Sequence, residues 1–104
     1  SEKEIEFWKK QFGAVFFASF GDNENFVFRP LKRNDWRILI TKIAKLPEPK
    51  KVEAIVAAGV VWPKLNDAAI NVLTAGVPES LKNLILEASN FMEPERAITL
   101  VRKL

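Results

Sequence analysis

The sequence predicts an α+β domain in which an N-terminal helix and one β-hairpin are followed by four to five short helices packed on the hairpin. Two aromatic runs, Ala14–Phe20 and Phe26–Arg29, flank the turn-forming stretch GDNEN, and this arrangement predicts the hairpin. After the hairpin, apolar residues recur at the helical period. The 104 residues contain no linker and no internal repeat, which predicts a single domain over residues 1–104.

The first helix is expected over Glu4–Phe12, because Ile5, Trp8 and Phe12 fall on one face at the i, i+3, i+7 spacing. Gly13 should end it, since glycine readily adopts the conformation that follows a helix. Seven of the eight Phe residues lie in this helix and the hairpin. A hairpin this apolar should bury one face against the helices that follow it.

The clearest apolar stripe predicts a helix over Asp35–Leu46 with Asn34 as its N-cap. The prolines of PEPKK should break this helix. The next stretch, Val52–Trp62, is so uniformly apolar that its period does not separate a buried helix from a buried strand. Its alanine content favours a helix, and the strand alternative for residues 54–62 stays open.

Three more helices are expected, over Asp67–Ala75, Pro78–Ser89 and Glu93–Leu104. Gly76 and Asn90 should end the first two and should both have positive φ. The buried core should join the hairpin to the helices. Its expected members are Phe16, Phe28, Trp36, Leu39, Ile43, Leu84 and Ile85.

The residue types that are missing limit the chemistry of the chain. It contains no His, no Cys and no Tyr, so imidazole bases, thiol nucleophiles and the common zinc, copper and iron sites are excluded. We therefore expect no enzymatic activity and no cofactor, and an enzyme based on carboxylates or Lys is the remaining catalytic alternative. No apolar run reaches the about 18 residues that span a bilayer, so no membrane association is expected.

The stretch GDNEN contains several oxygen ligands, Asp22 and Glu24 among them. A calcium loop needs more carboxylates at defined positions, whereas a hairpin turn needs only residues of these types. The sequence therefore favours a turn and no metal site.

Positive charge is concentrated between Arg29 and Lys51, where eight Lys or Arg residues against two acidic residues give a net charge of +6. Three interpretations are open for this basic segment, residues 29–51. It can be the solvated side of a helix, a surface for an acidic protein partner, or a nucleic-acid contact. The sequence favours them in that order, because no nucleic-acid-binding motif is present and the whole chain carries only +3.

Different roles are expected for individual residues of this segment. Arg29 ends the second strand, where its donors can hold loop or helix-end carbonyl groups, so it should be structural. Lys32, Arg33 and Arg37 flank the start of the next helix and should be exposed. Together with Trp62, these three are the candidate partner-binding residues.

Several short motifs resemble one known family. In order they are FRPL at the end of the second strand, VVWP, AGVP, and LKNLILEASNF. This order is similar to that in the tail assembly chaperones of long-tailed bacteriophages, over Phe26–Phe91. In the last motif Asn90 stands where the family often has Gly, and Glu93–Leu104 has no counterpart.

The resemblance implies a non-enzymatic protein that binds the tape-measure protein, or another tail protein, and keeps its apolar helices soluble during assembly. A structural tail protein is the nearest variant, and the expected location is the host cytoplasm or the virion. The partner helix is expected in a groove between the hairpin and the helices. The alternative is a small nucleic-acid-binding or regulatory domain that uses the basic segment.

Overall fold

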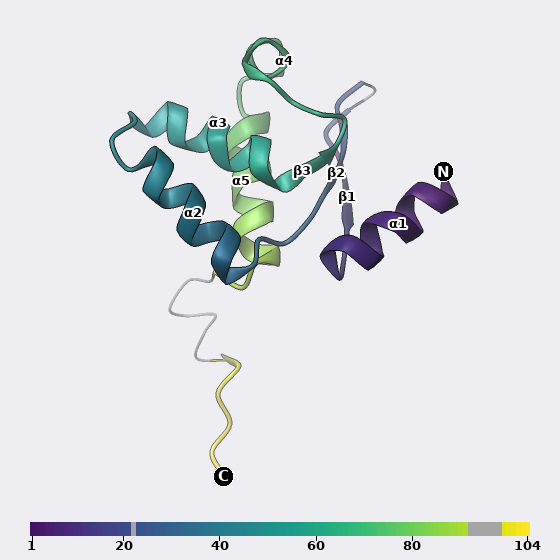
Figure 1. Ribbon diagram of the computed structural model, residues 1–104, viewed down its shortest axis with the longest axis vertical. Coiled ribbons are helices and arrows are strands. Elements are labelled where there is room, and N and C mark those ends of the chain that lie inside the picture. The colour runs from purple at the N-terminus through teal and green to yellow at the C-terminus, as the bar shows by residue number, and fades with distance from the viewer. Residues whose placement is uncertain (22, 92–98) are drawn as a thin grey trace.

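The described part of the chain, residues 1–21, 23–91 and 99–104, forms five helices and a three-stranded antiparallel sheet in a computed structural model (Figure 1). The predicted α+β class is therefore confirmed. The elements are α1 (Glu2–Phe12), β1 (Phe16–Ser19), β2 (Asn25–Phe28), α2 (Arg33–Ile43), α3 (Glu48–Gly59), β3 (Val60–Trp62), α4 (Asp67–Asn71) and α5 (Val77–Ala88).

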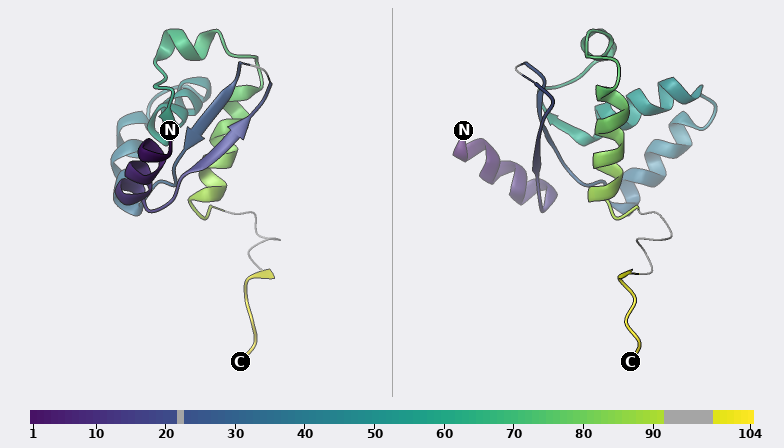
Figure 2. Two further views of the ribbon diagram at one scale, coloured as in Figure 1. Left: turned by 90° about the vertical axis from the view of Figure 1, so that its right-hand side faces the viewer. Right: turned by 180° about the vertical axis from the view of Figure 1, so that it is seen from behind.

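The sheet has the strand order β1-β2-β3. The predicted hairpin pairs Phe16 with Phe28 and Ser19 with Asn25. Because side chains alternate along a strand, Phe26 and Phe28 of β2 point together into the core and are buried. The helices α3 and α5 lie on this inner face, whereas α1 lies on the opposite side of the sheet (Figures 1 and 2).

The apolar stretch before Trp62 contains both of the structures that the sequence left open. It is helical up to Gly59 and then continues directly as β3, which pairs with β2. Gly59, the last residue of α3, allows α5 to pack closely at this point. A Cβ atom on this residue would lie 2.6–2.9 Å from three carbons of Ile85, so only glycine lets α5 approach this closely. The Gly59 carbonyl also accepts a hydrogen bond from the Arg29 amide at 2.9 Å, which attaches the end of β2 to the end of α3.

The end of α1 is predicted correctly, whereas the start of α2 is not. The first helix ends at Gly13 as predicted, with φ of 87°, and Ser1 caps its start. In α2 the predicted N-cap Asn34 is wrong, because the helix begins at Arg33. The carboxylate of Asp35 accepts a hydrogen bond from the Lys32 amide at 3.1 Å, and this contact fixes the start one turn before Asp35.

The PEPKK stretch separates two helices as predicted, and it also begins the second of them, which was not predicted. The helix α2 ends at Ile43, and a short turn leads to Pro47, which is the N-cap of α3. Pro49 lies in the first turn of α3, where its missing amide hydrogen costs nothing because amides there have no partner within the helix.

The two predicted positive φ angles have opposite outcomes. Asn90 follows α5 with φ of 69°, which confirms the prediction. Gly76 has φ of −85° and is the N-cap of α5, so it is not a helix stop. The helix before it, α4, is capped by Asn66 as expected but ends at Asn71, five residues before Gly76. Half of the helix predicted over Glu93–Leu104, residues 93–98, lies outside the described residues, and residues 101–104 are not helical, so the prediction is wrong for this last part.

Most of the predicted core is correct. Phe28, Ile43 and Ile85 are buried, and Trp36 and Leu39 pack against them partly exposed. Phe16 and Leu84 are exposed, so these two predictions are wrong. Phe16 lies on the edge strand, where its ring stacks on that of Phe28 with centroids 5.4 Å apart. On α5, Leu81 and Ile85 are fully buried, and Leu84 lies about 100° round the helix from Ile85.

The close approach at Gly59 gives a stability prediction with an internal control. Gly59→Ala should lower the free energy of unfolding by about 1–3 kcal/mol, because its methyl group overlaps Ile85 in a filled core. Gly76→Ala should change it far less, because nothing lies within 4 Å of the added methyl group and φ is negative. Urea unfolding measures both, and equal losses in the two variants would contradict the packing described for Gly59.

A second prediction concerns the tie between the hairpin tip and the α4–α5 connection. The carboxylate of Glu24 accepts hydrogen bonds from the amide and the hydroxyl of Thr74, both at 2.7 Å. These two bonds hold the pKa of Glu24 below its ordinary value of 4.5. A group with a lowered folded-state pKa stabilises the fold above its unfolded pKa, and this stabilisation is lost as the pH falls through the folded-state pKa.

Glu24→Gln should therefore lower the unfolding free energy at neutral pH, and the difference from the parent chain should shrink as the pH falls below about 4.5. Glutamine resembles the protonated carboxyl, so the two chains should become alike in acid. Unfolding curves recorded from neutral to acidic pH measure this difference. A difference that stays constant over that range would show that the charge of Glu24 plays no part.

Candidate protein-binding surfaces

An apolar groove of about 710 Å³ lies between α2, α3 and α5. Seven of its lining residues are apolar: Trp36, Ile40, Ile43, Ala44, Val52, Ile55 and Leu86. The four others, Thr41, Glu48, Lys51 and Lys82, carry the polar groups. A mainly apolar concavity with a few polar groups is the usual form of a binding site.

Two contacts position α2 beside α5 and so define the groove. The Leu31 amide, just before α2, donates a hydrogen bond to the Ser89 hydroxyl at the end of α5, at 2.7 Å. One turn further on, the ring of Trp36 lies on that of Phe91, with centroids 4.7 Å apart. The other end of α2 is joined to α3 by the short turn after Ile43. Both ends of α2 are therefore held, and the groove is part of the folded framework.

The two lysines that line the groove each form an ion pair with a glutamate of their own helix. Lys51 pairs with Glu48 at 3.4 Å on α3, and Lys82 pairs with Glu79 at 2.8 Å on α5. Exposed i, i+3 pairs of this kind are weak, so a partner can replace them at little cost. The groove can therefore accept an apolar surface that carries acidic groups at its margins.

The groove is not where the sequence analysis expected one. The expected site lay between the hairpin and the helices, but Phe26 and Phe28 on the inner face of the hairpin are buried in the core with α3 and α5. The groove was missed because its lining comes from three separate stretches of the chain, and no local pattern shows how these stretches pack together. Ile40 belongs to the apolar stripe that the sequence predicted for α2, but it is 39% exposed and lines the groove.

Three exposed cations, Lys32, Arg33 and Arg37, lie at the start of α2, and we call them the basic turn. Their predicted exposure is confirmed, whereas their role in binding stays a prediction. They share one helix end because Lys32 is the N-cap and the other two lie in the first two turns.

Arg29 has the structural role that the sequence predicted. Its guanidinium pairs with the Asp35 carboxylate at 3.0 Å, and it also lies 4.6 Å from the ring centre of Phe12. Burial raises the pKa of Asp35, but the hydrogen bond from the Lys32 amide and the Arg29 guanidinium outweigh it and hold that pKa below its ordinary value of 3.8. Arg29 thus connects α1, the end of β2 and the start of α2.

Trp62, the fourth candidate partner-binding residue, is exposed on β3 and lies on a different element from the basic turn. It is opposite Val27 of β2, which in turn is opposite Phe17 of β1. Opposite residues project from the same side of a regular sheet, so Phe17 and Val27 lie together on the outer face, whereas Trp62 ends a strand whose register with β2 shifts at Val27. The four candidates are therefore split between the start of α2 and the end of β3.

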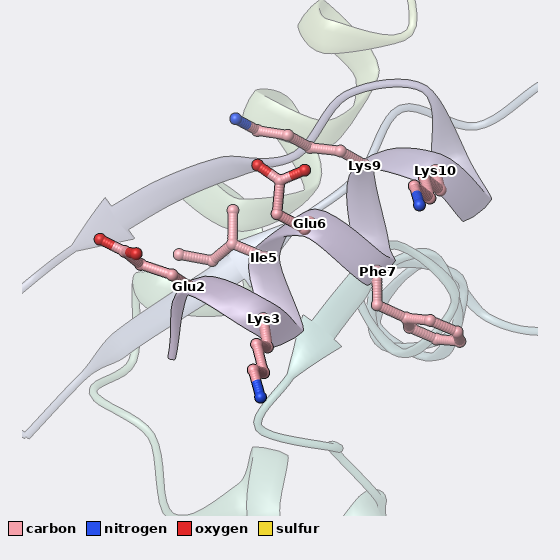
Figure 3. A pocket seen from close by; sticks show the side chains of 7 residues that line it. All are labelled: Glu2, Lys3, Ile5, Glu6, Phe7, Lys9 and Lys10. Carbon is pink, nitrogen blue, oxygen red and sulfur yellow. The ribbon is translucent and has the colours of Figure 1, made fainter.

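Figure 3 shows another hollow, on the exposed side of α1. All seven residues that line it belong to this one helix, Phe7 and Ile5 among them. A single helix surrounds a ligand on one side only, so this surface is less suited to binding than the groove between three helices.

The oxygen-rich stretch GDNEN is a hairpin turn in the residues that are described, and Asp22 lies outside them. Glu24 is engaged by Thr74 through both carboxylate oxygens. No group of three His, Cys, Asp or Glu side chains within the described ranges could hold a metal ion. Among the same residues, no helix has both the length and the apolar character needed to cross a bilayer.

No protein-family model matches this chain, and neither a curated protein nor a solved structure gives a significant match. The resemblance to the tail assembly chaperones therefore stays a prediction.

The two kinds of arginine near α2 can be told apart by substitution. Arg29→Ala should lower the unfolding free energy by about 1–3 kcal/mol, because it removes a charged hydrogen bond and a cation–ring contact and leaves Asp35 without its cationic partner. Arg33→Ala, on the exposed basic turn, should change it by about 0.5 kcal/mol or less. Denaturant unfolding measures both values, and a larger loss for Arg33→Ala would overturn the assignment of Arg29 as structural.

Proposed function

We propose that this chain is a non-enzymatic protein of a long-tailed phage that acts by protein–protein binding, as a tail assembly chaperone or as a structural tail protein. The observation that supports it most is the apolar groove between α2, α3 and α5. The motif resemblance over Phe26–Phe91 supplies the biological setting.

The proposed ligand of the groove is an amphipathic helix. A helix in a groove is recognised through apolar residues at i, i+3 or i+4, and i+7, which lie along one stripe. Ile40, Val52 and Leu86 come from three different helices and would contact such a stripe from different sides. Each apolar side chain that a partner buries there would contribute roughly 1.5–3 kcal/mol before the cost of association.

The proposed partner is the tape-measure protein or another tail protein. A long helical protein of this kind exposes apolar stripes until it is assembled, and exposed apolar surface leads to aggregation. Covering one stripe would keep the partner soluble. The basic turn would attract acidic groups of the partner and raise the association rate, an effect that weakens as salt is added. The proposed place of action is the host cytoplasm, or the virion if the protein stays bound.

The experiment is co-purification of the chain with the tape-measure protein encoded in the same genome. Ile40→Asp should abolish co-purification, because it places a charge in the groove. Ile38→Asp is the matched control, since Ile38 is on the same helix, lies outside the lining of the groove and is 57% exposed against 39% for Ile40. Circular dichroism should show the same helical content for both variants.

Two results would contradict the proposal. If Ile40→Asp and Ile38→Asp bind the partner equally well, the groove is not the site. If the chain instead retards generic DNA or RNA at about 0.15 M salt, and replacing Lys32, Arg33 and Arg37 by Glu abolishes this, the nucleic-acid alternative takes its place.

A further inference from the structure

The strand β1 is an open edge of the sheet. It pairs with β2 on one side, and the strand order β1-β2-β3 leaves its other side without a neighbouring strand in the described residues. The left-hand view of Figure 2 shows β1 at the border of the sheet, with α1 lying towards the other border. Nothing in that view continues the sheet beyond β1.

The free backbone groups of β1 can be assigned from its pairing. The Phe20 amide donates to the Glu24 carbonyl at 2.8 Å, so even-numbered residues direct their backbone groups towards β2. Because the direction alternates in an antiparallel strand, Val15, Phe17 and Ser19 direct theirs away from the sheet. These residues present amide and carbonyl groups at the spacing that another strand requires.

This edge is short, at four residues, but it lacks the charges and prolines that usually prevent strand pairing. Natural edge strands carry Lys, Pro or inward-pointing charges. The stretch Ala14–Phe20 contains no charged residue, no Pro and no Gly. Instead Phe17, in the middle of β1, is 67% exposed, and Phe16 beside it is also exposed.

We propose that β1 pairs antiparallel with β1 of a second copy, about a two-fold axis that passes midway between the two Phe17 residues and is perpendicular to the sheet. In this register Phe17 is opposite its own counterpart and Val15 is opposite Ser19, so the outward backbone groups of both strands meet. The two sheets become one sheet of six strands. The interface is isologous, because the same surface is used by both copies.

A second copy fits this edge better than a strand of another protein for two reasons. A strand without charge can lie against itself with no like-charge repulsion, which is the main obstacle to self-pairing. The two Phe17 rings would also lie side by side across the axis on the outer face, and aromatic pairs stabilise opposite positions in a sheet. The aromatic ring is exposed at the point where the symmetry brings two copies together.

The proposed axis places both copies of the helical layer on the same side of the joined sheet. If the proposed function holds, the two grooves would therefore face the same side and could engage two stripes of one long partner, which raises the effective affinity. This consequence rests on the proposed function, whereas the pairing of β1 does not.

The first test is the molar mass of the full chain in solution, measured by light scattering over a range of concentrations. The parent chain should approach twice the 11.8 kDa of one copy. Phe17→Lys should have the mass of a single copy, because two Lys residues would face each other across the axis. Phe7→Lys is the matched control, as Phe7 is 63% exposed on α1, and it should remain a dimer.

The second test uses the absence of Cys from the chain, which permits single-cysteine variants. With the proposed register, the Cα atoms at position 17 of the two copies are about 5.5 Å apart, within the range of a disulfide. At position 19 they are about 14 Å apart, which is too far. An added oxidant should therefore link Phe17→Cys into a covalent dimer and leave Ser19→Cys single.

A parent chain with the mass of one copy up to millimolar concentration would overturn the proposal. So would loss of the dimer in Phe7→Lys to the same extent as in Phe17→Lys. Efficient linking of Ser19→Cys with none of Phe17→Cys would contradict the register. None of these results depends on whether the groove binds a tail protein, so failure here and failure of the proposed function can be distinguished.

Discussion

The close approach of α5 to Gly59 is the contact on which the rest of the structure depends. At this residue the chain passes from α3 into β3 without a loop, and the missing side chain lets Ile85 lie against the backbone. The carbonyl of the same residue accepts a hydrogen bond from the Arg29 amide. One residue thus joins a helix pair to the sheet, and any larger side chain would separate all three elements. Ile85 and Val56, next to this contact, are among the most completely buried residues described.

The groove follows from this arrangement. Since α3 and α5 are fixed against each other at Gly59, α2 must pack beside them, and its ends are held by Ser89 and by the short turn after Ile43. Ile43 and Ile55 then form a buried base, and Ile40 stays partly open above it. Arg29 fixes the start of α2 by the ion pair of its side chain with Asp35. Because its amide is also bonded to the Gly59 carbonyl, Arg29 connects the contact at Gly59 to the surface that carries the basic turn. The charged residues here are therefore of two kinds: Arg29 and Asp35 form an ion pair with each other, whereas the basic turn is exposed to solvent or to a partner.

Sequence patterns were sufficient wherever a local rule decided the structure. The hairpin, the stop at Gly13 and the left-handed turn at Asn90 each depend on residues within one short stretch. Sequence patterns failed where contacts between distant parts of the chain decided the structure.

Gly76 resembles a helix stop, but the preceding helix is too short to reach it. Gly59 looked like one small residue in an apolar run, because its role depends on Ile85, which lies 26 residues further along the chain. The groove was also missed because it depends on tertiary contacts. Its lining comes from three helices, and local sequence patterns do not predict how these helices pack.

The central claim is that the groove between α2, α3 and α5 holds a helix of a protein partner. The most direct measurement is an NMR titration of the labelled chain with a helical peptide from the tape-measure protein of the same genome. The account predicts that the largest shifts fall on amides lining the groove, at Ile40, Thr41, Ala44, Val52 and Lys82, while those of β1 and β3 move little. Shifts centred on Phe17 and Trp62 of the sheet, or no shifts with a peptide that still binds the intact protein, would contradict it.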